Sequence, residues 1–222
     1  MSLDLSPFVV SLRLGLWVTG ILLLVCFPLA WALSRARGGW AIWLESLVSL
    51  PLFLSPTVLG FYLLLALSPR MPFGRFMESA FHIRLAFSFA GITIGGCVSG
   101  MPFMLTALKS GMMGVSDNLV EASYTLGKGR IETIVRVVIP NMKAALLAGI
   151  ITAFAHAMGE FGVMYMIGGS VPGKTRVVSI AIYERVEALD YAGAGAYALL
   201  LLAGSYIAIF AMNVLQRKGS RR

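Results

Sequence analysis

The sequence predicts an all-α integral membrane protein with about five transmembrane helices. Three observations predict this class: 58% of the 222 residues are hydrophobic, only 13% are charged, and the apolar residues gather in long runs. An ordinary soluble domain carries about 25% charged residues. This chain therefore has too little charge to cover a surface that faces water, and we expect lipid around most of it.

The five predicted spans are the apolar runs that are long enough to cross a bilayer, which takes about 20 residues. They are residues 15–33, 46–68, 85–108, 144–170 and 191–216. We expect 70–84 and 169–190 to be loops outside these spans. The whole chain, residues 1–222, has the length of a single transmembrane domain.

The basic residues predict the orientation in the membrane. Five spans place the termini on opposite sides, and the segments on one side hold more Lys and Arg than those on the other. The richer set comprises Arg35, Arg37, Lys109, Lys128, Arg130, Arg136, Lys143 and the four basic residues of 217–222. By the positive-inside rule, residues 109–140 and the C-terminus are cytoplasmic and the N-terminus is outside. The net charge of +8 is thus a topology signal, and no nucleic-acid partner is expected.

Residues 109–140 form a polar insertion with helical periodicity of its own. Leu119, Ala122, Ser123 and Leu126 fall on one helical face, and Ile131, Ile134, Val135 and Val138 on another, on either side of Gly127-Lys128-Gly129. Asn118 and Glu121 have the spacing of a capping box. Two short helices joined by a glycine turn are therefore expected. Their apolar faces pack either against the chain's own helix ends and the lipid interface or into a groove on a partner; periodicity leaves both open.

The same insertion resembles the EAA loop of ABC importer permeases. Glu121-Ala122-Ser123, three residues, Gly127, nine residues, Val137, one residue and Ile139-Pro140 reproduce the spacing of that loop. Ser123, Val137 and Ile139 depart from its pattern by conservative changes. The resemblance implies a coupling helix that docks in a cleft of a separate ATP-hydrolysing subunit, with Gly127 at the turn and Pro140 where the chain re-enters the membrane.

Further strings resemble the molybdate and tungstate permeases of type I importers, with sulfate and thiosulfate permeases as close relatives. These strings are Leu50-Pro51-Leu52, residues 55–60, Gly159-Glu160-Phe161-Gly162, residues 171–176 and Ala181-Ile182-Tyr183. The resemblance implies a permease in the inner or plasma membrane that is not itself an enzyme. It implies as partners a second copy, two ATP-binding cassette subunits that carry the ATP and magnesium, and an extracytoplasmic oxyanion-binding protein. No cofactor is expected in this chain.

One motif matches the phosphate-binding loop of nucleotide-binding proteins. Gly168, Gly173, Lys174 and Thr175 match the phosphate-loop pattern G-x-x-x-x-G-K-T. That loop needs a strand before it and an acidic strand elsewhere, but here an apolar span precedes it and the predicted topology places it outside. We therefore expect a turn and no nucleotide site. No Cys or His spacing indicates a metal, and Cys26 and Cys97 are expected to be buried free thiols.

Two ionisable residues lie within the fourth span. His156 and Glu160 are one helical turn apart, and groups of this kind at membrane depth usually face a cavity or a partner. They line a pathway or simply satisfy each other, and Gly159 and Gly162 predict a helix break beside them. A membrane enzyme that uses this pair is the alternative from another class, although no nucleophile accompanies it. A secondary transporter is a further alternative, but it would have no use for a coupling loop.

Polar residues in the other apolar runs are the remaining candidates for a pathway. An anion that crosses lipid needs polar groups and helix N-termini. The hydroxyl candidates are Ser55, Thr57, Ser88, Thr93 and Ser99. The competing interpretation is that each hydroxyl bonds back to its own helix.

Overall fold

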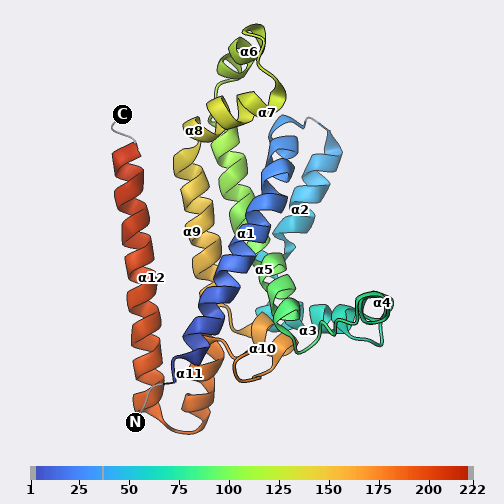
Figure 1. Ribbon diagram of the computed structural model, residues 1–222, viewed down its shortest axis with the longest axis vertical. Helices are drawn as coiled ribbons and strands as arrows, with labels where there is room; N and C mark the ends of the chain where they lie inside the picture. The colour runs from blue at the N-terminus through green and yellow to red at the C-terminus, as the bar shows by residue number, and fades with distance from the viewer. Residues whose placement is uncertain (1–3, 37, 220–222) are drawn as a thin grey trace.

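The computed structural model describes residues 4–36 and 38–219, and this part of the chain contains helices and connecting segments without a strand. Figure 1 shows most of the long helices running along one axis. The elements are α1 (Ser6–Arg35), α2 (Gly39–Phe53), α3 (Pro56–Leu67), α4 (Pro72–Phe81), α5 (Phe89–Met113), α6 (Asp117–Thr125), α7 (Arg130–Thr133), the π-helix η1 (Ile134–Val138), α8 (Ile139–Asn141), α9 (Lys143–Gly159), α10 (Gly162–Gly168), α11 (Val178–Glu187) and α12 (Tyr191–Gly219).

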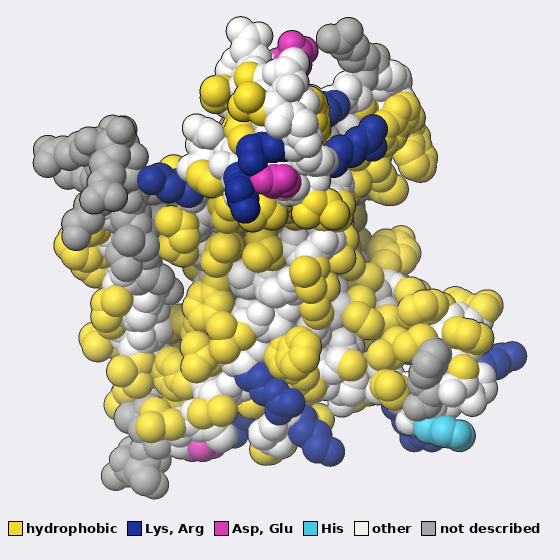
Figure 2. Space-filling model, turned by 45° about the horizontal axis from the view of Figure 1, so that its top comes forward, with side chains coloured by type: hydrophobic (Ala, Val, Ile, Leu, Met, Phe, Trp, Pro, Cys, Tyr) yellow, Lys and Arg dark blue, Asp and Glu magenta, His cyan; other side chains and the backbone are white. Residues whose placement is uncertain are grey.

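Helices α1, α5 and α9 form the centre of the bundle (Figure 1). Leu14, Val18 and Leu22 on α1 are fully buried there. A Cβ placed on Gly96 of α5 would lie 2.7 Å from a methyl of Val18, so this glycine allows the two helices their close approach. The flanks of the molecule are covered by hydrophobic side chains (Figure 2), as expected for a surface that faces lipid.

Among the described residues, two helices are long and apolar enough to cross a membrane, and up to four spans result if each bent helix pair counts as one span. Helices α1 and α5 are unbroken and long enough to cross a membrane. The pair α2–α3 is bent by 114°, and the segment Arg130–Asn141 meets α9 at 80°. In α12 the described apolar part is Tyr191–Ile207. The predicted span over 46–68 is therefore not one straight helix: α2 already begins at Gly39, and the chain turns sharply after Phe53.

The local sequence favours a bend between α2 and α3. Pro56 has no N–H and disfavours helical geometry in the residue before it, and Ser55 is accordingly extended with φ −58° and ψ 135°. Helix α3 then starts with the proline at its first turn. The apolar run continues through this turn, which is why it resembles one long helix in the sequence.

The fourth predicted span breaks where the glycines indicate. Helix α9 ends at Gly159, Glu160 is extended, and α10 begins at Gly162. A Cβ on Gly162 would lie 2.8 Å from Cβ of Pro56, and one on Gly60 would lie 3.0 Å from Cα of Val163. Helix α3 thus packs directly on α10, and the two helix breaks face each other.

Both segments expected as loops contain a helix. Within 70–84, α4 starts with Pro72 in its first turn and ends at Phe81, and its C-cap residue His82 is left-handed with φ 54°. Within 169–190, α11 runs from Val178, and its residues Ile180 and Ala181 are fully buried. Both helices are too short to give a hydropathy signal, and tertiary packing rather than propensity stabilises helices of this length.

Candidate functional site

Residues 114–142, here named the cap segment, cover one end of the bundle. They contain α6, α7, η1 and α8, and they lie at the end where α12 finishes and opposite the end where α1 starts (Figure 1). This arrangement agrees with an odd number of crossings. Arg37 and the tail residues Arg221 and Arg222, which contributed to the predicted orientation, lie outside the described residues.

The turn of the cap segment is built by Gly127. Its φ of +78° is left-handed, a conformation that glycine adopts without a steric penalty. The Gly127 N–H donates to the Tyr124 carbonyl at 2.9 Å, and the Lys128 N–H donates to the Ser123 carbonyl at 3.1 Å. These two bonds are the Schellman pattern that satisfies the last carbonyls of a helix. The expected glycine turn is therefore present at the expected residue.

A buried hydroxyl pair joins the two halves of the cap segment. Ser123 Oγ on α6 lies 2.9 Å from Thr133 Oγ1 on α7, and both residues are buried. Each hydroxyl thus satisfies the other away from water. The position that departs from the Glu-Ala-Ala pattern, Ser123, is the one that makes this bond.

The start of α6 in the cap segment differs from the prediction. Helix α6 begins at Asp117 with Ser116 as the N-cap residue, and that cap makes no side-chain hydrogen bond. The predicted capping box at Asn118 is therefore wrong, because Asn118 already lies inside the helix. At the other end, a π-helical turn over Ile134–Val138 precedes Pro140, whose missing N–H cannot complete an α-helical hydrogen bond.

The two apolar stripes of the cap segment are largely uncovered. Leu126 is 78% exposed, Ile131 79%, Val135 55% and Leu119 48%, whereas Val138 is buried. Glu121 is also exposed and has no ion pair or hydrogen-bonding side chain within the described chain. The chain's own helices therefore cover only a part of this surface, and apolar side chains that stand out in this way mark an interaction surface.

Charge around the cap segment is organised by Glu132. Its carboxylate accepts from Lys128 Nζ at 2.5 Å and lies 3.2 Å from Arg136 Nη1. The hydrogen bond from Lys128 holds the pKa of Glu132 below its usual value. Figure 2 shows Lys and Arg side chains gathered in this region. The surroundings of the exposed stripes are thus basic.

A pocket of about 200 Å³ lies where the two helix breaks meet, and we name it the break pocket. Its lining comes from α2, α3, α5, α9 and α10 and comprises Pro51, Leu52, Leu54, Pro56, Leu59, Ser99, Phe103, His156, Glu160 and Val163. Three predicted pathway residues, Ser99, His156 and Glu160, therefore share one cavity. The apolar members and Phe103 could not be singled out among the many apolar residues of the sequence.

Glu160 occupies the centre of the helix break. It is only 8% exposed, and its Oε1 accepts the Val163 N–H at 3.3 Å. Its Oε2 lies 3.4 Å from Nε2 of His156 without a hydrogen bond between them, and the centroids of the His156 and Phe103 rings are 4.6 Å apart. The Ser179 hydroxyl donates to the Glu160 carbonyl at 2.8 Å. The pair is thus held in place but keeps unused hydrogen-bonding capacity.

The other predicted pathway hydroxyls lie apart from this pocket. Ser55 and Thr57 flank Pro56 at the α2–α3 bend and are exposed. Ser88 caps α5 by accepting the Gly91 N–H at 3.1 Å, and Thr93 donates to the Phe89 carbonyl at 2.8 Å. For Ser88 and Thr93 the structure therefore fits the competing interpretation, in which the hydroxyl serves its own helix. Ser99 in the break pocket also donates to the Gly96 carbonyl of its own helix, at 3.4 Å.

The phosphate-loop match forms a closed turn after α10. The Thr175 hydroxyl is fully buried, donates to the Gly168 carbonyl at 2.7 Å and accepts the Val171 N–H at 3.0 Å. Gly169 and Gly173 have positive φ, and Lys174 is exposed. The hydroxyl that a phosphate loop uses for magnesium is here engaged in the turn itself.

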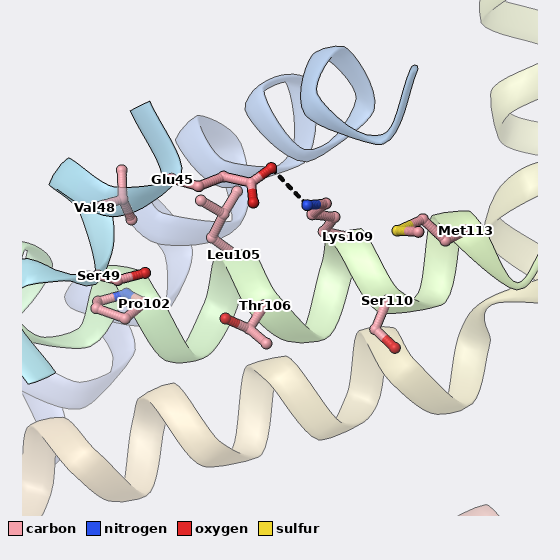
Figure 3. A pocket seen from close by; sticks show the side chains of 9 residues that line it. All are labelled: Glu45, Val48, Ser49, Pro102, Leu105, Thr106, Lys109, Ser110 and Met113. Atoms are coloured by element: carbon pink, nitrogen blue, oxygen red, sulfur yellow. Dashed lines mark hydrogen bonds and ion pairs between the residues drawn. The ribbon is translucent and has the colours of Figure 1, made fainter. Parts of the chain in front are cut away.

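A second pocket, of about 330 Å³, lies between α2 and α5 towards the cap segment (Figure 3). We name it the α2–α5 pocket. Lys109 Nζ donates to Glu45 Oε1 at 2.5 Å across its mouth, and the other lining residues are Val48, Ser49, Pro102, Leu105, Thr106, Ser110 and Met113. Sequence reasoning missed this site, because 64 positions separate the ion-paired residues and no periodicity connects them.

Comparisons with known proteins identify the family. The model of the binding-protein-dependent transport system inner membrane component matches residues 15–221. The molybdenum transport system permease protein ModB of Azotobacter vinelandii is 36% identical over 96% of this chain and 95% of its own length. The sulfate transport system permease protein CysT of Salmonella typhimurium is 32% identical over 98% of this chain and 76% of its own.

Solved structures show the same fold. The inward-facing MetNI methionine ABC transporter superposes with a TM-score of 0.74, at 14% identity, over 99% of each chain. A bacterial ABC transporter that imports alginate superposes with a TM-score of 0.71, at 17% identity. The predicted all-α type I importer domain is thereby confirmed. The chain belongs to the inner-membrane components of binding-protein-dependent transport systems, and it is a permease subunit of the type I ABC importers rather than an enzyme.

Proposed function

We propose that this chain is the permease subunit of an ATP-driven importer that moves a tetrahedral oxyanion, molybdate or tungstate, into the cell. The molybdenum permease relative, which aligns over almost the full length of both chains, supports this substrate. Sulfate is the second candidate, because a sulfate permease is 32% identical over 98% of this chain. Both ions are tetrahedral dianions and would call for similar donors.

The observation that carries the proposal is the exposed, internally braced cap segment. In our proposal Glu121, Ala122 and Ser123 form the helix that docks on the ATPase, and Gly127 sets the turn. Val137, Ile139 and Pro140 connect this helix to α9. A separate ATP-binding cassette subunit would cover the uncovered Leu126 and Ile131 and would supply the ATP and magnesium. Glu121 then meets a basic or hydrogen-bonding group of that partner.

The assembly follows from this assignment. The cap segment and the C-terminus face the cytoplasm, the N-terminus faces outside, and the complex lies in the inner or plasma membrane. Two copies of the chain pair with two ATPase subunits, and an extracytoplasmic binding protein delivers the oxyanion to the opposite end. The break pocket, with Ser99, His156 and Glu160, lies on the pathway; Ser55 and Thr57 lie beside it at the bend.

An uptake experiment tests the substrate. The permease, its ATPase and its binding protein are produced in cells that lack their own molybdate and sulfate importers, and entry of radiolabelled molybdate is measured. We expect uptake that needs ATP hydrolysis and is abolished by excess tungstate but not by excess sulfate. Inhibition by sulfate together with uptake of labelled sulfate would transfer the assignment to sulfate. Uptake that persists with a hydrolysis-deficient ATPase would overturn the proposal.

A charge reversal tests the coupling role. Glu121→Lys should leave membrane insertion intact but lower the amount of substrate imported per ATP hydrolysed. Asp117→Lys makes the same change in charge one turn earlier on α6 and serves as the control for net charge. Wild-type coupling in Glu121→Lys would count against the docking of this helix on the ATPase.

A further inference from the structure

We propose that the α2–α5 pocket is a second, low-affinity oxyanion site, placed between the break pocket and the cap segment and masked by the Glu45–Lys109 ion pair. The inference rests on the proposed function, because the ligand it names is the transported oxyanion. It assigns chemistry to residues outside the break pocket and the cap segment.

The position of the pocket follows from the helices that line both cavities. The break pocket uses Pro51 and Leu52 of α2, and the α2–α5 pocket uses Val48 and Ser49, one turn nearer the cap segment. On α5, Ser99 and Phe103 line the first cavity, and residues from Pro102 to Met113 line the second. The two cavities therefore succeed each other along the same two helices.

The donors in the pocket suit an oxyanion. Lys109 is the one cation among the nine described lining residues, and its side chain is 27% exposed, so its charge is partly shielded from water. Ammonium and hydroxyl groups donate charge-assisted hydrogen bonds to anionic oxygens. The volume of about 330 Å³ accepts a tetrahedral dianion together with some of its water.

Three hydroxyls in the pocket are free for a ligand. Ser49, Thr106 and Ser110 come from two helices, and none of them has a hydrogen-bond partner within the described residues. Hydroxyls in helices commonly bond back to their own backbone. Ser46 on α2 and Thr93 on α5 do so at 2.8 Å each. The residues with unused hydroxyls thus line the same cavity as Lys109.

Glu45 keeps the affinity of this site low. Its carboxylate already accepts from the Lys109 ammonium, so an incoming oxyanion has to displace it. A transport pathway needs sites that bind weakly enough to release their ion, and an internal carboxylate that competes for the only lining cation provides this. If the ion pair were purely structural, replacing Glu45 and replacing Lys109 would have the same effect on oxyanion binding.

Protection of an engineered thiol tests the site directly. Met113 lines the pocket, is 65% exposed and is not one of the proposed donors. Met113→Cys, in a chain that also carries Cys26→Ala and Cys97→Ala, is assembled with its ATPase in phosphatidylcholine nanodiscs, which contain no anionic headgroup. The rate of alkylation by an uncharged maleimide is measured against molybdate, sulfate and, at matched ionic strength, chloride. Ser116→Cys, exposed on the cap segment, is the control.

We expect molybdate and sulfate, but not chloride, to slow labelling at Met113→Cys and to leave labelling at Ser116→Cys unchanged. Lys109→Gln should raise the oxyanion concentration needed for half-maximal protection about tenfold, because one charge-assisted bond is lost. Glu45→Gln should lower that concentration about tenfold, because Lys109 is released from its ion pair. Thr106→Val, which retains both charges, should weaken protection by a smaller factor. Thr106→Val therefore still tests the site if a charge variant fails to assemble.

No protection by either oxyanion, or the same effect from Lys109→Gln and Glu45→Gln, would overturn the second site. The two proposals fail separately. Normal ATP-driven uptake without protection removes only the second site. Protection without ATP-driven uptake of either oxyanion removes the proposed import function.

Discussion

Replacing Gly127 by alanine is the sharpest test of how the cap segment keeps its shape. Gly127 has a φ of +78°, and a Cβ added there would meet no atom within 4 Å. The change therefore introduces no clash, and its whole cost is the left-handed backbone. Gly129, two residues on, also has open space around it but has a φ of −71°, so Gly129→Ala is a control of identical chemistry.

The magnitude follows from the backbone alone. A residue other than glycine in the left-handed region costs about 1–2 kcal/mol. This raises the equilibrium for opening the turn by a factor of about 5–30. At Gly129, the N-cap residue of α7, alanine adopts the observed φ without strain, so only the smaller cost of an alanine N-cap is expected there.

Hydrogen exchange reads this equilibrium at the amides that close the turn. The N–H groups of residues 127 and 128 donate to the carbonyls of Tyr124 and Ser123. In Gly127→Ala both should exchange about 5–30 times faster than in Gly129→Ala, and substrate imported per ATP should fall in parallel. Equal exchange in the two variants would refute the reasoning that the left-handed turn holds α6 in its orientation.

Three further predictions concern packing and the break pocket. Ser123→Ala leaves the buried Thr133 hydroxyl unpaired and should lower stability by about 1–3 kcal/mol; thermal unfolding in detergent should show a smaller loss when Thr133→Val is added. Glu160→Gln should abolish most uptake at a normal yield of assembled complex, and wild-type uptake would make its charge dispensable. Gly60→Val, whose Cβ would lie 2.8 Å from Cβ of Met166, should cost about 1–3 kcal/mol, whereas Gly20→Ala, with no atom within 4 Å, should not destabilise.

The sequence predicts which segments are apolar and long enough to lie in lipid, but it does not predict where these segments bend. The positions of the prolines do not predict the bends. Pro28, Pro51 and Pro102 lie inside helices that continue through them, whereas Pro56 begins a new helix at a sharp bend. Neighbouring helices decide which proline breaks the chain. Pro56 packs closely on Gly162 of α10, a residue more than a hundred positions away in the sequence.

Local patterns are predictable where the residue itself fixes the backbone. Gly127 sets the turn, and Gly159 and Gly162 accompany the break at Glu160, as expected. The roles of hydroxyls are not predictable in this way. Ser88 and Ser99 lie in the same apolar run and are equivalent by hydropathy, yet Ser88 caps a helix and Ser99 lines the break pocket. Which hydroxyl reaches a cavity depends on the helix face that its neighbours leave open.

The geometry of α9 explains how an event at the cap segment reaches the break pocket in the proposed mechanism. Helix α9 starts at Lys143, directly after the cap segment, and ends at Gly159, next to Glu160. Its 17 residues span about 25 Å at 1.5 Å per residue.

Close glycine packing ties α9 to its neighbour α5. A Cβ on Gly111 would lie 2.5 Å from Cβ of Ala145, and one on Gly149 would lie 3.1 Å from Sδ of Met104. Because α5 and α9 are in contact over much of their length and both lead from the cap segment to the break pocket, a displacement of the cap moves them together. The weak points are then the helix breaks at Glu160 and Ser55, where the backbone changes direction, so the movement is expected to open or close the pocket there.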